Sequence, residues 1–350
     1  MKLATYKDGS RDGQLVVVSR DLASAHFATD IATRMQQVLD DWNFISPQLQ
    51  DLYVTLNQGR ARHAFAFEPR QCMAPLPRAF QLACLPAYPS HGQRLSDAAM
   101  APLAETSWQG AADDLQGPHD DAWFASADTQ IDLEAGLAAI TGDLAQGVNA
   151  SQGLDGVRLL VLANTWCLRG LLPATPGDEA AADAPLARLQ SRPTAAFAPV
   201  AVTPDELGDA WSRGRVQLGL NCTVRGKRLG LCDAGTDMAR HFGELIAGLA
   251  RTRRLRAGCI VATGPISNTD AARGFACLAE KRAAEVLAGG SPRTDYLVFG
   301  DAVQIDMKGL DGQSIFGALS QRVVGPGMDS QVPTPVETLV KDPASSSDTA

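Results

Sequence analysis

The sequence predicts a protein of mixed α and β structure, in which a small α/β unit precedes a larger region rich in strands. Its length of 350 residues suggests two domains, or one large domain with a smaller neighbour. Helical and strand patterns alternate in the first part of the chain, whereas many short strands follow between about residues 80 and 325. We therefore expect a domain at residues 1–78, a second at 79–324 and a disordered tail at 325–350, which is rich in Pro, Ser, Thr and Asp.

Composition and charge exclude several classes of protein. The hydrophobic share of 45% and the charged share of 20% exclude a disordered, collagen-like or coiled-coil chain. The net charge of -8 disfavours a nucleic acid or an anionic membrane as a partner. Seven cysteines without a Cys-x-x-Cys pair indicate neither a zinc ribbon nor a disulfide framework. Residues 1–13 lack a secretory h-region and the longest apolar run is too short to span a bilayer, so we expect a cytoplasmic protein.

The N-terminal unit is expected to place two helices over a short sheet. Residues 15–18 form a β-branched run that predicts a buried strand. Apolar residues recur on one helical face from residue 31 to residue 42, and a second apolar stripe follows at residues 49–56. Ser46 and Pro47 are typical of the N-cap and the first residue of this second helix, and Gly59 is expected to end it.

The larger region is expected to consist mainly of strands. A glycine turn at residues 225–227 joins two of them in a hairpin. One clear helix is expected at residues 237–254, where an arginine cluster suits the C-terminus of a helix, and a long loop is expected at residues 175–185. The strands are expected at residues 131–140, 158–164, 216–224, 228–232, 259–263, 296–299, 302–307 and 314–324.

A set of short strings along the chain is specific in combination. The strings are DGQLVVVSR at 12–20, PLPRA at 75–79, IDLE at 131–134, SRP at 191–193, FAPVAVTP at 197–204, SN at 267–268, ARG at 272–274 and AEKR at 279–282. Together they resemble the fumarylacetoacetate hydrolase family, in its branch with a short N-terminal domain, over nearly the whole chain to about residue 324. The resemblance implies an α+β fold with a mixed β-sandwich or rolled β-barrel core and a small N-terminal α/β domain. It also implies a homodimer and divalent-cation chemistry on β-dicarbonyl or 2-oxo acids.

Most of the metal ligands that the resemblance implies are replaced in this chain. The family uses an aspartate seven residues before a histidine, a Glu-x-Glu pair and a later aspartate. The corresponding residues here are Cys84, Glu134, Gly136 and Thr165, so one carboxylate remains. Mg²⁺ and Ca²⁺ prefer a cage of oxygen ligands, and we therefore expect no metal cofactor. A softer zinc site formed by Cys84, Glu134 and His91 is the alternative.

The acid–base residues that the resemblance implies are retained. They are a histidine, His91, and the glutamate that orients it, Glu280. A histidine beside a carboxylate is suited to proton transfer near neutral pH. Without the resemblance, His91 in the loop-like stretch 88–92 and Glu280 beside basic residues are equally consistent with exposed polar residues. Pro265 replaces the family's threonine in a Gly-Thr-x-Ser turn and offers neither a hydroxyl nor an N–H group.

Four further residues are expected to bind substrate. The family's substrate-binding arginine and lysine correspond to Arg169 and Arg192, and Glu134 and Tyr88 are placed in the same pocket. A guanidinium at residue 192 keeps the positive charge and can hold a carboxylate through two hydrogen bonds. A buried Glu134 without its metal should pair with Arg169 or Arg192, or take up a proton.

Two functions from different classes remain open. In the first, the chain is an enzyme that acts on a β-dicarbonyl, 2-oxo or enol acid by metal-independent hydrolysis, tautomerisation, decarboxylation, dehydration or cyclisation. In the second, it is a catalytically inactive member of the family with a structural or regulatory role. The first predicts His91 within reach of Glu280 beside a closed pocket that favours anions. The second predicts a pocket filled by apolar side chains.

Overall fold

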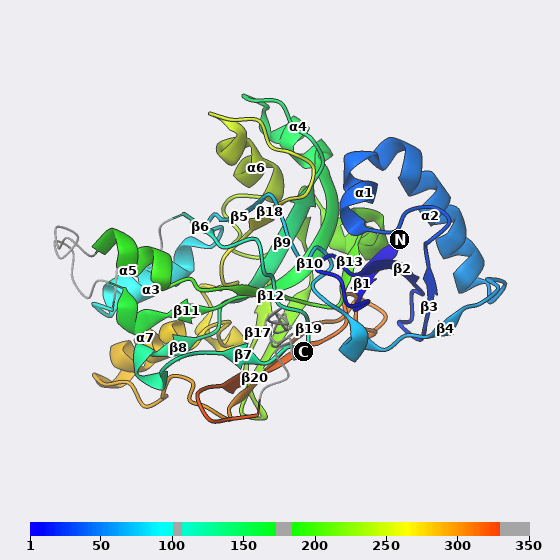
Figure 1. The fold of residues 1–350 in the computed structure, drawn as a ribbon. Helices are drawn as coiled ribbons and strands as arrows, with labels where there is room; N and C mark the ends of the chain where they lie inside the picture. The colour runs from blue at the N-terminus through cyan, green and yellow to red at the C-terminus, as the bar shows by residue number, and fades with distance from the viewer. Residues whose placement is uncertain (101–106, 173–183, 330–350) are drawn as a thin grey trace, which may run out of the picture.

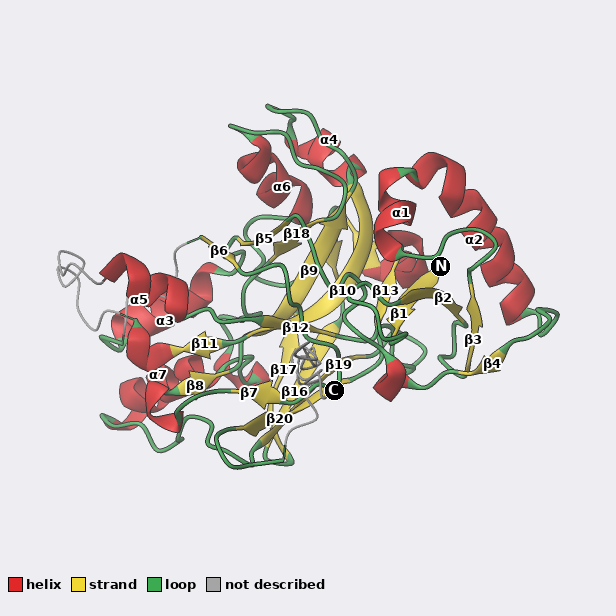
Figure 2. Ribbon diagram, viewed as in Figure 1, coloured by secondary structure: helices red, strands yellow, loops and turns green. Residues whose placement is uncertain are grey.

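A computed structural model describes residues 1–100, 107–172 and 184–329 of the chain (Figure 1). Most of the loop expected at 175–185 and residues 330–350 of the expected tail lie outside the described residues. Figure 2 shows the strands gathered in the middle of the molecule, with the helices in groups around them.

The larger sheet runs through both the N-terminal unit and the rest of the chain. Strand β1 pairs with β2 on one side and with β13 on the other, with Leu3 opposite Val17 and Ala201. In hydrogen-bonded order the strands are β4 (Phe65–Ala66), β3 (Ser24–Phe27), β2 (Gln14–Val18), β1 (Lys2–Tyr6), β13 (Val200–Val202), β10 (Val157–Thr165), β9 (Ala135–Thr141), β18 (Cys259–Ala262), β5 (Gln81–Cys84) and β6 (Trp108–Gly110), with β12 (Ala195–Phe197) also paired to β10. The central strands β9 and β10 are buried almost throughout, which explains why their sequences read as continuous apolar runs.

A second sheet contains the predicted hairpin. Its order is β17 (Lys227–Asp233), β16 (Gly219–Val224), β19 (Ala302–Met307), β20 (Leu319–Val324) and β7 (Ala122–Trp123). Arg225 and Gly226 both adopt positive φ angles between β16 and β17, the backbone that a tight hairpin turn requires. Two short pairs complete the strands: β8 (Ile131–Asp132) with β11 (Cys167–Leu168), and β14 (Trp211–Ser212) with β15 (Arg215–Val216).

The helices cover separate parts of this framework (Figure 2). In the described residues they are α1 (Met35–Asp40), α2 (Trp42–Asn57), α3 (Pro89–Asp97), α4 (Ala150–Asp155), α5 (Ala184–Gln190), α6 (Phe242–Ala250) and α7 (Leu278–Gly289). Helices α1 and α2 lie beside the N-terminal strands, α4 packs against α6, and α3 packs against α7. The contact between α3 and α7 brings together two segments that are almost 190 residues apart, at His91 and Glu280.

The predicted boundaries of two helices are wrong. Helix α2 begins at Trp42, and Pro47 lies inside it, where the missing N–H group costs one backbone hydrogen bond near the start of the helix. Helix α6 begins at Phe242 and not at residue 237, because the His241 side chain accepts a hydrogen bond from the backbone N–H of Gly243 and caps the helix there. Helix α6 ends at Ala250, so that the arginine cluster expected in its last turn follows the helix.

Four predicted strands are shorter than expected. The segment expected at 216–224 divides into β15, which ends at Val216, and β16, which begins at Gly219. The segment 131–140 divides into β8 and β9, because Leu133 and Glu134 leave the strand between them. Within residues 296–299 only Leu297 forms a bridge, opposite Ile131, and the last strand is confined to Leu319–Val324. The α+β class is nevertheless confirmed, and the two main sheets stay open at both ends over the described residues. None of the helices in the described part of the chain has the length and apolar character needed to cross a membrane.

Candidate active site

Glu134 is held at the break between β8 and β9. Its backbone N–H donates to Oδ1 of Asn164 at 3.0 Å, and its carbonyl accepts from the backbone N–H of Thr165, also at 3.0 Å. Both partners lie at the end of β10, which pairs with β9 along this stretch. The Glu134 side chain is only 1% exposed. The end of one buried strand therefore fixes a carboxylate inside the protein.

Two arginines neutralise this carboxylate. Nη2 of Arg169 donates to Oε1 of Glu134 at 2.6 Å, and Nη1 of Arg192 donates to Oε2. Arg169 also donates through Nε to Oδ2 of Asp132 at 3.0 Å. Asp132, Glu134, Arg169 and Arg192 thus form a buried carboxylate–guanidinium cluster with two charges of each sign. The expectation that Glu134 would pair with an arginine is confirmed.

The arginine charges decide the ionisation of Glu134. Burial alone would raise the pKa of its carboxyl group, but the charges of Arg192 and Arg169 outweigh this effect and hold the pKa below its ordinary value. Glu134 is therefore ionised at neutral pH. Arg192 is fixed from its other side by Trp108, because its Cζ lies 5.0 Å from the centre of the indole ring.

Asp132 connects the cluster to helix α7. Its Oδ1 accepts from the backbone N–H of Leu278 at 2.7 Å and its Oδ2 from that of Ala279 at 3.0 Å. These are the first two residues of α7, whose N–H groups have no partner within the helix. A carboxylate is also favoured at this end of the helix by the helix dipole. The same aspartate thus positions both Arg169 and the helix turn that carries Glu280.

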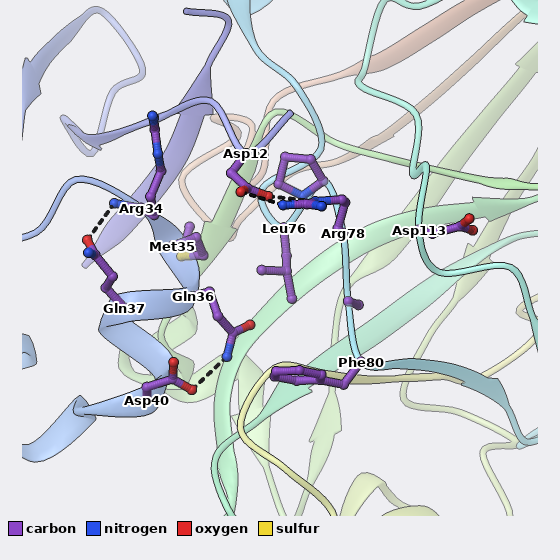
Figure 3. Close-up of a pocket in the computed structure, with 12 residues that line it drawn as sticks. Asp12, Arg34, Met35, Gln36, Gln37, Asp40, Leu76, Arg78, Phe80 and Asp113 are labelled. Carbon is purple, nitrogen blue, oxygen red and sulfur yellow. Dashed lines mark hydrogen bonds and ion pairs between the residues drawn. The ribbon is translucent and has the colours of Figure 1, made fainter. Parts of the chain in front are cut away.

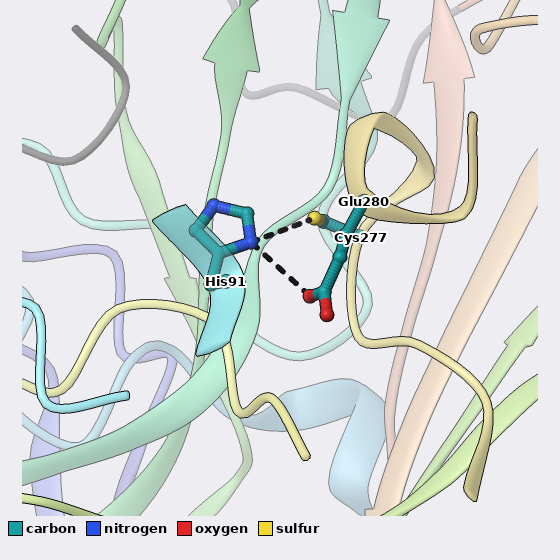
Figure 4. A group of neighbouring side chains, drawn as sticks. All are labelled: His91, Cys277 and Glu280. Carbon is teal, nitrogen blue, oxygen red and sulfur yellow. Dashed lines mark hydrogen bonds and ion pairs between the residues drawn. The ribbon is translucent and has the colours of Figure 1, made fainter. Parts of the chain in front are cut away.

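His91 and Glu280 meet in the interior of the protein (Figure 4). Nδ1 of His91 lies 3.1 Å from Oε2 of Glu280, and the two residues are 4% and 0% exposed. The alternative that either residue is an exposed polar group is therefore wrong. His91 also does not lie in a loop: it is the third residue of α3, which begins at Pro89.

The second carboxylate oxygen of Glu280 has partners that the sequence did not reveal. Oε1 accepts from Nη1 of Arg94 and from the Ser267 hydroxyl at 2.6 Å. Ser90 donates in turn to the Ser267 hydroxyl at 2.8 Å. Arg94 stands three residues after His91 on α3, and this helical spacing was the one available signal, since it places both side chains on the same face.

Tyr88 is engaged elsewhere. Its hydroxyl donates to the backbone carbonyl of Ala234 at 2.7 Å, and the residue is 2% exposed. Tyr88 is the N-cap residue of α3, and its hydroxyl is bonded to this carbonyl and not to the cluster or to Glu280.

Two cavities border the helices that carry these groups, and a third lies apart from them. One of about 350 Å³ is bounded by α3, α7 and the turn after β11. Its lining includes Arg169, Arg282, Tyr296, Leu95 and Ala279. A second, of about 510 Å³, lies on the other side of α3 and is lined by residues that include Ser90 and Arg94. The third, also about 510 Å³, lies between α1 and residues 76–80 and contains none of the predicted site residues (Figure 3).

The two parts of the chain match two family models. Residues 1–78 match the model described as fumarylacetoacetase N-terminal domain 2, and residues 83–324 match that of the fumarylacetoacetate (FAA) hydrolase C-terminal region. The chain belongs to the fumarylacetoacetate hydrolase family. No curated protein matches it.

Solved structures share this fold at low sequence identity. Maleylpyruvate hydrolase from Sphingobium sp. SYK-6, in complex with manganese(II) and pyruvate, has a TM-score of 0.62 and 17% identity, covering 93% of this chain and 99% of that chain. Fumarylacetoacetate hydrolase from psychrophilic Exiguobacterium antarcticum has a TM-score of 0.63 and 18% identity, covering 93% and 99%. 2-Hydroxyhepta-2,4-diene-1,7-dioate isomerase from Mycobacterium marinum has a TM-score of 0.56 and 14% identity, covering 94% and 100%.

The residues that the sequence resemblance assigns to the family's metal positions do not fit a hard divalent cation. Both oxygens of Glu134 already accept from guanidinium groups, and Thr165 offers a hydroxyl 3.3 Å from Oε2 instead of a carboxylate. At Gly136 a Cβ atom would lie 2.2 Å from the carbonyl oxygen of Gly264, so that this backbone occupies the space of a second glutamate. Cys84 contributes a thiol in place of the first aspartate. Such a donor set lacks the oxygen cage that Mg²⁺, Mn²⁺ or Ca²⁺ requires.

Replacing Glu134 tests the carboxylate–guanidinium cluster. Glu134→Gln leaves two buried guanidiniums without their anion, and we expect a loss of about 3–5 kcal/mol in the free energy of unfolding at pH 7. Urea unfolding followed by circular dichroism measures this loss. The exposed Glu68→Gln is the control and should change the free energy by less than about 0.5 kcal/mol. Equal stability of the two variants would contradict the structural role of the cluster.

The stability difference between wild type and Glu134→Gln should also depend on pH. The folded-state pKa of Glu134 is depressed, so its stabilising effect is complete above the ordinary carboxyl pKa of about 4.3 and is lost as the pH falls through the folded value. The stability difference between wild type and Glu134→Gln should therefore be constant from pH 6 to pH 8, roughly, and shrink below about pH 4. A difference that grows on acidification would contradict this sign.

Gly136 provides a test of the expectation that this chain holds no metal. Gly136→Ala and Gly136→Glu both introduce a Cβ against the Gly264 carbonyl, so we expect each to cost about 1–3 kcal/mol of stability. The glutamate variant restores the family pattern in sequence but should gain no thermal stability from added Mn²⁺. A rise of its unfolding midpoint with Mn²⁺, absent from the alanine variant, would show that the site still accepts a metal.

Proposed function

We propose that the protein is an enzyme that tautomerises or isomerises a 2-oxo, enol or β-dicarbonyl acid by proton transfer at His91, without a divalent cation. The observation that carries the proposal is the buried His91–Glu280 pair, whose atoms lie within hydrogen-bond distance while Glu134 is already neutralised by arginines. Family membership supports the general class of chemistry. In the proposed reaction the acid–base residues His91 and Glu280 act without a divalent cation as Lewis acid.

The geometry suits His91 to act as a general base. The Glu280 carboxylate accepts a hydrogen bond from Nδ1 of His91, which assigns the tautomer with its proton on Nδ1. In this tautomer Nε2 is the nitrogen that carries a lone pair. Arg94 and Ser267 hold the other oxygen of Glu280, so the carboxylate keeps its orientation. An oriented imidazole of this kind supplies roughly 10²- to 10⁴-fold in rate to a proton transfer.

The hydrogen bonds beyond Glu280 give the pair a route to solvent. Ser267 donates to Glu280 and receives a hydrogen bond from Ser90, and Ser90 lines the cavity on the outer side of α3. A buried acid–base pair must regain its resting protonation state after each turnover. The two hydroxyls offer a continuous path of hydrogen bonds for this exchange.

Arginines supply positive charge near the pair. The cavity of about 350 Å³ is lined by Arg169 and Arg282, beside Leu95 from the helix of His91 and Ala279 from the helix of Glu280. Its volume falls within the usual range for small ligands. A substrate carboxylate in this cavity would lie beside Arg282, whereas the guanidinium of Arg169 is already bonded to Asp132 and Glu134. His91 and Glu280 lie on the two helices that bound the cavity and are not among its lining residues.

Proton transfer demands less of this site than C–C bond hydrolysis. Hydrolysis of a dicarbonyl substrate needs an activated water and strong stabilisation of the developing oxyanion, a role that suits a Lewis acid. Pro265 offers no N–H group at the family's Gly-Thr-x-Ser turn, which removes one donor for that oxyanion. Two of the solved structures of similar fold are named as hydrolases and one as an isomerase. Of these two kinds of reaction, isomerisation is the one that we propose for the residues of this chain.

One observation favours a second candidate function. The guanidiniums of Arg169 and Arg192 are both bonded to Glu134 and not turned to an open anion site. A catalytically inactive protein with a structural role would tolerate this arrangement. Deuterium incorporation into 2-oxo acids separates the two, because the inactive protein would leave the exchange at its uncatalysed rate.

The enzyme proposal is tested with a panel of 2-oxo dicarboxylic acids and acyl pyruvates in D₂O. Wild-type protein treated with EDTA should accelerate exchange of the proton next to the carbonyl, measured by NMR. His91→Ala should reduce that rate by about 10²- to 10⁴-fold, because the oriented base is lost. His63→Asn, at an exposed histidine with a positive φ angle, is the matched control and should retain the rate.

Two outcomes would overturn the proposed mechanism. Exchange that persists undiminished in His91→Ala would remove this histidine from proton transfer. Activity that disappears with EDTA and returns with Mg²⁺ or Mn²⁺ would show that the reaction depends on a metal.

A further inference from the structure

A thiol lies beside the His91–Glu280 pair. Sγ of Cys277 is 3.8 Å from Nδ1 of His91, the same nitrogen that lies 3.1 Å from Oε2 of Glu280 (Figure 4). The ligand atoms of the three residues all lie within 4.8 Å of one another, and all three residues are buried. An imidazole, a thiol and a carboxylate therefore converge on one point between α3 and the start of α7.

The spacing of these atoms suits a tetrahedral metal ion. Zinc binds imidazole nitrogen at about 2.0–2.1 Å, carboxylate oxygen at about 2.0–2.2 Å and thiolate sulfur at about 2.3 Å. Ligand atoms around such an ion are about 3.3–3.8 Å apart, by the geometry of a tetrahedron with these bond lengths. The Nδ1–Sγ separation already lies at this value, and the Nδ1–Oε2 separation is within a few tenths of an ångström of it. Only a small outward movement of the side chains would admit an ion.

The donor set determines which ions can bind. One nitrogen, one sulfur and one oxygen favour Zn²⁺ or Co²⁺ over Mg²⁺ or Ca²⁺, which take oxygen ligands. Burial raises the pKa of the Cys277 thiol, so the ion must displace its proton, and Arg94 on Glu280 adds a positive charge beside the site. Both effects weaken binding and exclude cations of low affinity for thiolate.

We propose that His91, Cys277 and Glu280 form a binding site for a thiophilic divalent cation, with Zn²⁺ as the ion that fits it best. Three protein ligands leave the fourth position of the ion for water or a small anion. This trio is distinct from the family's metal positions at residues 84, 134, 136 and 165, and from the zinc alternative that the sequence suggested.

Occupation of this site would inhibit the enzyme, a consequence that rests on the proposed function. The ion takes Nδ1 of His91 and displaces the thiol proton of Cys277 to solvent. Nδ1 can coordinate only without its proton, so the neutral imidazole in the complex carries its one proton on Nε2. Because Nε2 carries that proton, it can no longer accept one from a substrate, and Glu280 is withdrawn from the histidine.

Cobalt provides a direct test of the site. Apo protein prepared with a chelator is titrated with Co²⁺ and followed by absorption spectroscopy. We expect one equivalent of Co²⁺ to produce a thiolate-to-cobalt charge-transfer band in the near ultraviolet and the intense visible bands of a tetrahedral ion. Zn²⁺ should abolish both sets of bands by competition, whereas Mg²⁺ should leave them unchanged.

Two cysteine variants identify which cysteine supplies the sulfur ligand of the bound Co²⁺. Cys277→Ser should lose the charge-transfer band and bind Co²⁺ at least about 10-fold more weakly, because a thiolate ligand is removed. Cys84→Ser should retain the band, since Cys84 lies outside the trio. Far-ultraviolet circular dichroism of the metal-free proteins shows whether each variant is folded. A His91→Gln variant supplies a second assignment and should lose the tetrahedral visible bands.

Different experimental results would contradict the metal site and the proposed enzyme function. Absence of tetrahedral bands in the folded wild type, or a band that Cys277→Ser retains, would overturn the metal site whatever the activity. Zn²⁺ inhibition of proton exchange that Cys277→Ser relieves by at least 10-fold would support the inhibitory role. Inhibition of equal strength in Cys277→Ser would overturn that role. A wild type that binds Co²⁺ but shows no proton exchange would leave the metal site standing and contradict the enzyme function.

Discussion

The carboxylate of Glu134, held between two guanidiniums, is the interaction on which the site depends. An ionised carboxylate is costly to bury unless opposite charges and hydrogen bonds surround it. Arg169 and Arg192 supply both, and Asp132 balances the second positive charge. Burial raises the pKa of Asp132, and the charge of Arg169 together with the N–H groups of Leu278 and Ala279 opposes that rise. Within the cluster, two guanidiniums thus face two carboxyl groups. The same arrangement occupies the electron pairs that a hard cation would need.

This cluster also links the two halves of the site. Asp132 bonds to Arg169 and to the first backbone N–H groups of α7, and α7 carries Glu280. Glu280 in turn orients His91 on α3. A change in the charge balance at Glu134 is therefore connected to the acid–base pair by a short series of hydrogen bonds.

Sequence patterns predicted features that local chemistry determines. A tight hairpin turn requires positive φ angles, which glycine adopts readily, so the hairpin at Arg225–Gly226 could be predicted. The pairing of Glu134 with an arginine followed from the cost of a buried charge. Pro47 shows the limit of such rules, because a proline is favoured at the first residue of a helix, yet Pro47 lies inside α2. Ser267 belongs to one of the strings that carry the resemblance, but its bond to Glu280 is a tertiary contact that the string does not reveal. Cys277 likewise joins the site only through a tertiary contact. The reason for glycine at residue 136 is the Gly264 carbonyl, which is distant in the sequence.

A crystal of the full chain grown with Mn²⁺ tests the central claim most directly, through an anomalous difference map at the manganese edge. The account predicts no peak beside Glu134, with Arg169 and Arg192 both in contact with its carboxylate. A full-occupancy Mn²⁺ bound to Glu134, with Arg192 turned away, would contradict the claim that guanidinium groups have taken the place of the metal.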